Sequence, residues 1–114
     1  MYAKKAIEIA NNLRPNALGE EQKYQWLLEL DAKVADMMEQ LPQELKFPKD
    51  FELFMPFPYD NIYQLYLVAQ IDYYNQETAL YSNDMTMFNA AWDEATAWWR
   101  RNMRQREFGN WRIM

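Results

Sequence analysis

The chain has 114 residues, half of them hydrophobic, and a formal net charge of −5, which suits a single domain with a sizeable core. It contains no cysteine and no histidine, so disulfides, thiolate nucleophiles, imidazole bases and nearly every zinc site are excluded. Its two glycines leave no glycine-rich loop for a phosphate, and we expect neither a signal peptide nor a membrane-spanning run of roughly 20 apolar residues. The composition therefore predicts no cofactor, no metal site and no membrane partner.

Two helices are expected in the first part of the chain. Apolar residues at three- and four-residue steps predict a short helix over residues 3–13. A proline and a glycine within residues 14–19 break this pattern. A second helix is expected from about residue 20 to residue 41, where Pro42 ends it. It carries two apolar stripes, the narrower one including Trp26, and two stripes indicate two packing partners.

Residues 42–59 form a linker with four prolines and five aromatic residues. This composition rules out a helix, and it is too apolar for a free loop. We expect the segment to lie extended across the body, and a short strand over residues 51–55 is compatible with the pattern. The phenylalanines expected to press into grooves of the body are Phe47, Phe51, Phe54 and Phe57.

A third helix, rich in tyrosine, is expected after Asp60, which is a favourable N-cap residue. Its pattern continues to about residue 82 and leaves only a narrow polar stripe. A helix with so much apolar surface is central in its bundle or is covered by another subunit. Ser82 or Asn83 would then cap a fourth helix that runs to about residue 106 and shows core spacing along one face.

The last residues of the chain predict a short extended arm. Phe108, Trp111 and Ile113 alternate around a glycine and an asparagine, a pattern that favours an extended segment over a helix. Such an arm could add a strand to a neighbouring protein's sheet, and a disordered end is the alternative. The expected fold is an all-α bundle of about four helices over residues 1–107, with an extended linker rich in proline and phenylalanine and an extended C-terminal arm over residues 108–114.

Two acidic residues interrupt apolar helical faces. Asp31 lies on the main stripe of the second helix, and Asp72 lies on the tyrosine-rich helix. An unpaired buried charge is costly, so we expect Asp31 to bind a tyrosine hydroxyl, an arginine or a helix N-terminus, and both residues to be structural buried carboxylates. A catalytic acid is the less favoured alternative. Glu77 follows Asp72 at a spacing that does not predict a shared face.

Positive charge is concentrated at the end of the chain. Residues 1–99 contain seven Lys or Arg and sixteen Asp or Glu, whereas residues 100–114 contain five Arg and a single Glu. These arginines could complement a helix dipole, meet an acidic protein surface or touch passing DNA, although the acidic body is a poor ligand for phosphates. The residues expected to form a partner-binding arm are Arg100, Arg101, Arg104, Phe108, Trp111 and Ile113.

The aromatic residues have two possible uses beyond the core. Base stacking uses such rings, but the tyrosine-rich helix has no basic neighbours. Aromatic residues and methionine are enriched in protein interfaces, so we favour a core combined with a subunit interface. The residues expected at this interface are Trp26, Tyr63, Tyr74 and Trp98.

Several segments resemble a known group of proteins. They are "KYQWLLELDAKV" at 23–34, "PYD" at 58–60, "YLVAQIDYYNQE" at 66–77 and "MFNAAWDEATAWW" at 87–99. Over residues 4–102 the chain is similar to head–tail connector (adaptor, neck) proteins of phages and prophages. The shared motifs are structural rather than catalytic.

The resemblance implies a non-enzymatic virion structural protein, a small helical subunit of a ring that lies beneath the portal and joins the capsid to the tail. It implies other copies of the chain, the portal protein and further neck or tail proteins as partners, with DNA only as a passing contact in a pore. Such a protein is made in the bacterial host cytoplasm and is located in the neck of the virion. The alternative left open is a small phage-encoded cytoplasmic protein-binding module that acts as a monomer or dimer.

Overall fold

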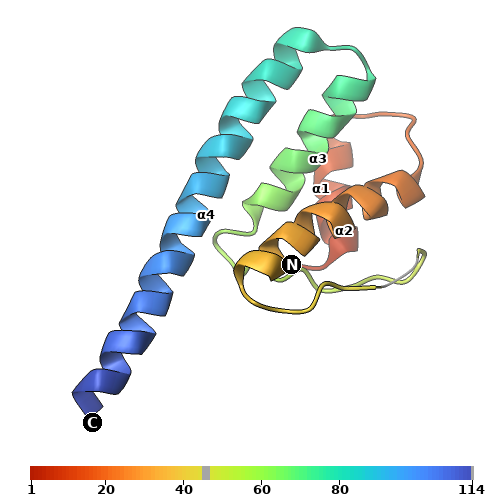
Figure 1. Cartoon of the computed structure of the whole chain (residues 1–114). Helices are drawn as coiled ribbons and strands as arrows, with labels where there is room; N and C mark the ends of the chain where they lie inside the picture. The colour runs from red at the N-terminus through yellow and green to blue at the C-terminus, as the bar shows by residue number, and fades with distance from the viewer. Residues whose placement is uncertain (45–46, 114) are drawn as a thin grey trace.

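The computed structural model of the chain describes residues 1–44 and 47–113, with side chains up to Met103. As the sequence predicts, the domain is all-α, and no strand is present within those residues (Figure 1). The four helices are α1 (Ala3–Leu13), α2 (Glu20–Met37), α3 (Asn61–Tyr74) and α4 (Thr78–Ile113).

The first two helices begin where the sequence predicts, but α2 is shorter than expected. It ends at Met37 instead of residue 41. Glu39 adopts a left-handed φ of 57°, and the Gln40 N–H donates to the Ala35 carbonyl at 2.8 Å. This capping geometry satisfies a terminal carbonyl, so the helix closes ahead of the proline that was expected to end it.

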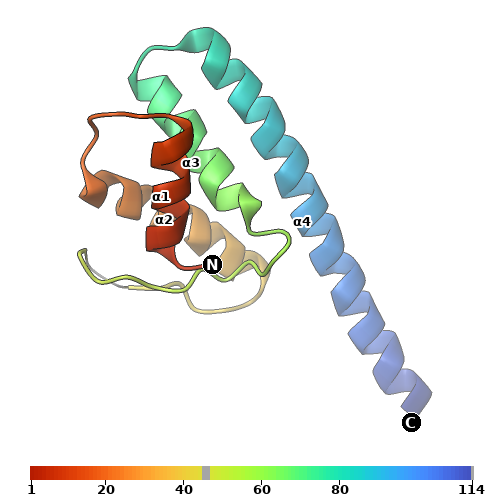
Figure 2. The same cartoon turned by 180° about the vertical axis from the view of Figure 1, so that it is seen from behind.

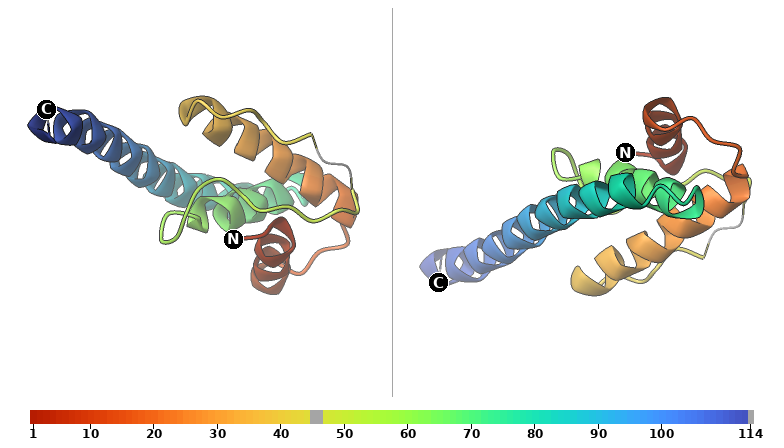
Figure 3. Two further views of the ribbon diagram at one scale, coloured as in Figure 1. Left: turned by 90° about the horizontal axis from the view of Figure 1, so that it is seen from below. Right: turned by 90° about the horizontal axis from the view of Figure 1, so that it is seen from above.

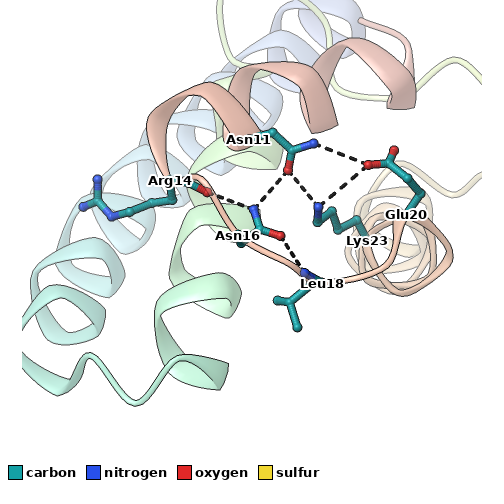
Figure 4. Close-up of polar contacts among 6 residues, drawn as sticks. All are labelled: Asn11, Arg14, Asn16, Leu18, Glu20 and Lys23. Carbon is teal, nitrogen blue, oxygen red and sulfur yellow. Dashed lines mark hydrogen bonds and ion pairs between the residues drawn. The ribbon is translucent and has the colours of Figure 1, made fainter.

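A polar network fixes the connection between α1 and α2 (Figure 4). The Asn16 side-chain amide donates to Asn11 Oδ1 at 3.1 Å and to the Arg14 carbonyl at 2.8 Å. The Leu18 N–H donates to Asn16 Oδ1 at 3.1 Å. Lys23 is buried, and its Nζ donates to the same Asn11 oxygen at 2.8 Å. Because a buried ammonium must be hydrogen-bonded, this lysine ties the start of α2 to the end of α1.

The linker between α2 and α3 crosses the body beside the N-terminus. The Ala3 N–H donates to the Phe51 carbonyl, and the Leu53 N–H donates to the Met1 carbonyl, both at 2.9 Å. These bonds hold the linker extended, as expected. They produce one isolated bridge, between Tyr2 and Glu52, in place of the short strand.

The expectation that four phenylalanines press into the body is only half right. Phe51 is buried and Phe54 is half-buried. Phe47 and Phe57, however, are 42 % and 84 % exposed. Phe57 sits between two prolines in a turn, and this turn keeps it outside the body.

The boundary between α3 and α4 differs from the prediction. α3 ends at Tyr74, not near residue 82, because Gln76 adopts a left-handed φ of 60° and the Glu77 N–H caps the Asp72 carbonyl at 2.9 Å. Ser82 and Asn83 consequently lie inside α4 and cap nothing. A second correction concerns the start of α3, where the Asp60 side chain makes no capping bond. Its carboxylate lies 3.8 Å from the N-terminal ammonium of Met1.

The expected extended arm is helical. The backbone of residues 108–113 continues α4, so the prediction of an extended segment is wrong there, and Met114 lies outside the described residues. One glycine inside a helix costs only about 1 kcal/mol relative to alanine, and Phe108, Trp111 and Ile113 are all compatible with helical geometry. A strand added to a partner's sheet is therefore no longer supported.

Helix α3 is central, and α4 is much longer than the part of the body that supports it. α4 packs along α3 (Figure 2), and α1 and α2 flank α3 on its two other sides (Figure 3). Within the described residues α3 is the sole helix that α4 contacts. At about 1.5 Å per residue, the 14 residues of α3 span about 21 Å and the 36 residues of α4 span about 54 Å. The far part of α4 therefore projects from the body, which gives the molecule its length of 56 Å (Figure 1).

Candidate functional site

The first polar centre of the molecule is buried around Asp31. Its Oδ1 accepts hydrogen bonds from the Tyr63 hydroxyl at 2.6 Å and the Phe54 N–H at 3.1 Å. Its Oδ2 accepts from the Gln43 side-chain amide at 2.7 Å, and the Tyr63 hydroxyl in turn accepts from the Met55 N–H at 2.9 Å. The centre joins α2, α3 and the linker. Of the three kinds of partner expected for Asp31, the structure shows the tyrosine hydroxyl.

Burial controls the protonation of this centre. It raises the pKa of Asp31, although the three hydrogen bonds act in the opposite direction. Burial also raises the pKa of Tyr63, and the charge of Asp31 and its hydrogen bond add to the effect. Tyr63 therefore remains a protonated donor. With both side chains enclosed, the centre holds segments together.

A second buried centre joins α3 and α4 to Arg14, the residue that directly follows α1. Arg14 Nε lies 3.0 Å from Asp72 Oδ2, and one of its terminal nitrogens lies 3.5 Å from Asp84 Oδ1. Both carboxylates are buried, and Asp84 Oδ2 has no hydrogen-bond partner among the described residues. Burial raises the pKa of Asp84 to about 6, the neighbouring Asp72 carboxyl acts in the same direction, and Arg14 opposes them. Asp72 is thus a structural buried carboxylate, as predicted.

Asp84, which directly follows the expected caps Ser82 and Asn83, was not singled out from the sequence. Asp84 lies at helical spacing before Phe88, Ala91 and Ala95, and all four residues are buried on the face of α4 that meets α3. This continuation of an apolar stripe was the signal that could have identified it.

An open pocket lies at the corner where α3 gives way to α4. It has a volume of about 780 Å³, and we call it the corner pocket. Its walls include Asp72, Tyr73, Tyr74, Glu77, Thr78 and Tyr81. The ring of Tyr73 lies 5.6 Å from that of Tyr74 and 5.3 Å from that of Tyr81, measured between centroids. The lining combines aromatic faces with two carboxylates and contains no lysine or arginine among the described residues.

The four residues expected at a subunit interface differ in their exposure. Trp26 is 4 % exposed and Tyr63 is 0 % exposed, so the prediction is wrong for both, because they fill the core between α2 and α3. Tyr74 is 55 % exposed beside the corner pocket, with its ring 5.2 Å from that of Trp26. Trp98 is half-buried and stacks on Tyr59 at 5.0 Å. Of the four, Tyr74 and Trp98 alone offer surface to another chain.

The basic end of α4 lies at the opposite end of the helix from the corner pocket (Figure 1). Arg100 and Arg101 are exposed. Arg100 donates a long hydrogen bond of 3.4 Å to Thr96 Oγ1, and Arg101 borders a shallow hollow beside Tyr59. The side chains of the other residues of the expected partner-binding arm lie outside the described set: Arg104, Phe108, Trp111 and Ile113.

Comparisons of the chain with protein-family models, with curated proteins and with solved structures found no match in any of the three. The resemblance to connector proteins consequently rests on the sequence segments alone. In the part of the chain that the structure describes, no helix combines the length and apolar character needed to cross a bilayer. The same part holds no group of three or more acidic residues placed to bind a metal ion.

Proposed function

We propose that the chain is a non-enzymatic structural protein of a phage or prophage virion, a head–tail connector (adaptor) subunit that forms a ring beneath the portal and joins the capsid to the tail. The observation that carries the proposal is the length of α4. This helix extends well past the only helix that it packs against in the described structure, and it ends in the basic segment of an otherwise acidic chain.

A ring built from identical subunits needs two different faces on each copy, because one face of each subunit meets another face of the next. The corner pocket and the basic end of α4 are two such faces, located at opposite ends of one helix. The non-enzymatic part of the proposal is supported by the structural role of the two buried acidic residues expected from the sequence. Asp31 and Asp72 are both engaged in bonds between segments of the fold.

The partners of this connector are further copies of the chain, the portal protein and other neck or tail proteins. The acidic body repels phosphates, so DNA that passes through the pore of the ring is a transient contact. The finished protein is located in the neck of the virion, after synthesis in the bacterial host cytoplasm.

One observation favours the alternative, a small phage-encoded cytoplasmic module that binds another protein as a monomer or dimer. Trp26 and Tyr63 are buried inside the single chain, so the body formed by α1, α2 and α3 closes its core without help from a neighbour. In this alternative the surface at Tyr73 and Tyr74, both more than half exposed, would receive the partner.

Electron microscopy separates these two functions. The purified protein is imaged alone and with the portal protein encoded in the same phage or prophage genome. A connector gives rings that cap one end of the portal, whereas a monomeric module gives small particles that leave the portal bare. Bare portals at high protein concentration would rule out the connector function. The identities of the genes next to this one provide an independent check.

A further inference from the structure

We propose that the corner pocket binds an arginine side chain from the basic end of α4 of a second copy of this chain. The contact would be head-to-tail, with the pocket of one copy receiving the Arg100–Arg101 segment of the next. The inference deepens the proposed function, on which it rests for the closure of such contacts into a ring.

The lining of the pocket suits a guanidinium group. Tyr73 is 59 % exposed and Tyr74 is 55 % exposed, so their rings are available to a ligand. Arginine stacks on aromatic faces and is less strongly hydrated than lysine, and its planar fork matches a carboxylate. The corner pocket offers both features together, because the exposed Glu77 lines it beside these rings.

The charge at the corner also favours a cation. Asp72 and Asp84 are buried next to each other, and Arg14 is the only cation within ion-pair distance of either carboxylate in the described structure. Glu77 adds a third carboxyl group to the same corner. One Asp84 oxygen is buried without a partner among the described residues, so a single guanidinium does not satisfy the centre. An incoming arginine lowers this excess of negative charge.

The basic end of α4 is the complementary surface. Residues 100–106 contain four arginines and no acidic residue, and the two described ones are exposed. They cannot reach the corner pocket of their own chain, because the pocket lies at Thr78 and 23 residues of continuous helix separate it from Arg101. At about 1.5 Å per residue this separation is about 35 Å. The contact must therefore be made between copies.

The polarity of the contact follows from its geometry. The donor and the receptor lie at opposite ends of one helix, so the interface joins two unlike surfaces and leaves one of each free. Repetition of this contact gives a closed ring or an open filament. A basic segment of a different protein is the competing occupant, and the experiment distinguishes it.

The first test is a titration of the full-length, isotope-labelled protein with a synthetic peptide of residues 97–107, followed by NMR. We expect the amide signals of Tyr73, Glu77 and Tyr81 to shift, and a control peptide with all four arginines replaced by glutamine to leave them in place. Shifts with both peptides, or with neither, would overturn the proposal.

The second test uses charge reversal at each side of the contact and sedimentation velocity. Glu77→Arg and Arg101→Glu are each expected to weaken self-association by about tenfold or more. A mixture of the two variants should recover association, because each variant supplies the intact surface that the other lacks. The matched control is Glu29→Arg, an exposed site on α2, which should associate like the wild type. Tyr73→Ala supplies a pocket variant without a charge change.

The outcomes separate this inference from the proposed function. Rings that form equally well with Glu77→Arg and Tyr73→Ala would refute the pocket contact and leave the connector function standing. Arginine-dependent peptide binding at the pocket, without rings under any condition, would retain the pocket as a receptor and remove the ring. A wild-type protein that neither binds the peptide nor self-associates would refute both.

Discussion

The exposure of aromatic residues differs between two regions of this molecule. In the body, Tyr63 and Trp26 are buried, and the Tyr63 hydroxyl is fully used between Asp31 and a backbone N–H. At the corner between α3 and α4, Tyr73 and Tyr74 are more than half exposed around an open pocket. Aromatic content alone therefore does not separate core from interface. A buried polar partner for the hydroxyl marks the core residue.

The same contrast holds along α4. Its first turns bury Phe88, Ala91 and Ala95 against α3, whereas its far part projects beyond the body (Figure 2). Most helical stability in proteins comes from tertiary packing, so a long helix that extends past its support indicates a surface for other chains. Substitutions in the packed body should therefore lower stability more than substitutions on the exposed surfaces.

The largest effect is expected from a pair of tryptophan truncations. Trp26→Ala opens a cavity in the core and should lower the free energy of unfolding by about 3–5 kcal/mol. Trp98→Ala removes a half-buried ring that stacks on Tyr59 and should cost less than half as much. Urea denaturation of both variants provides the comparison, and equal losses would contradict the division between core and surface.

The pH dependence of stability should reflect Asp84. Its pKa is raised to about 6 in the folded chain, whereas the unfolded carboxyl titrates near its ordinary value of about 4. Between these values the folded state holds a proton that the unfolded state releases, so the free energy of unfolding falls as pH rises through this window. Each tenfold difference in proton affinity between the two states is worth about 1.4 kcal/mol, so the fall is expected to reach up to about 3 kcal/mol.

The control for this prediction is a pair of amide substitutions on α4. Asp84→Asn removes the titrating group and should flatten this part of the profile, while Asp93→Asn, at an exposed site, should leave it unchanged. The raised pKa of Asp31 has the same sign, so a residual slope is expected in both variants. Unfolding free energies measured across the acidic range would contradict the assignment if Asp84→Asn kept the full slope.

A smaller effect is expected when a single hydroxyl is removed from the buried centre. Tyr63→Phe leaves the Met55 N–H without its acceptor and Asp31 without its shortest bond, which should cost about 1–2 kcal/mol. Tyr74→Phe removes an exposed hydroxyl and should stay within about 0.5 kcal/mol of the wild type. Thermal and urea unfolding of the two variants test the contrast, and a neutral Tyr63→Phe would show that the hydroxyl is not part of the core.

Local patterns in the sequence predicted much of the fold. Apolar periodicity and the prolines identified all four helices and the extended linker, because both signals act within a few residues. The turn at Gln76 was missed because its left-handed conformation involves neither glycine nor proline. The helical continuation past Gly109 was missed because an apparent alternation over seven residues was read as an extended segment.

The candidate site was harder to predict from the sequence than the fold. The position of Asp31 on an apolar stripe correctly predicted a buried, hydrogen-bonded carboxylate, but it did not decide between a tyrosine, an arginine and a helix N-terminus as its partner. The corner pocket, however, combines residues from two helices, and its position depends on where α3 ends. Since the boundary was placed eight residues too late, Asp72 and Glu77 were assigned to different faces of one helix instead of to one pocket.

The role of the projecting part of α4 in assembly is tested most directly by comparing the full chain with a variant that ends at Trp99. The two are studied by sedimentation equilibrium across a wide concentration range and by urea unfolding. We expect the full chain to rise above its monomer mass of 13.9 kDa with increasing concentration. The shortened chain should remain a monomer with the same free energy of unfolding, within about 0.5 kcal/mol. A full chain that stays monomeric throughout, or a shortened chain that fails to fold, would contradict this division of roles.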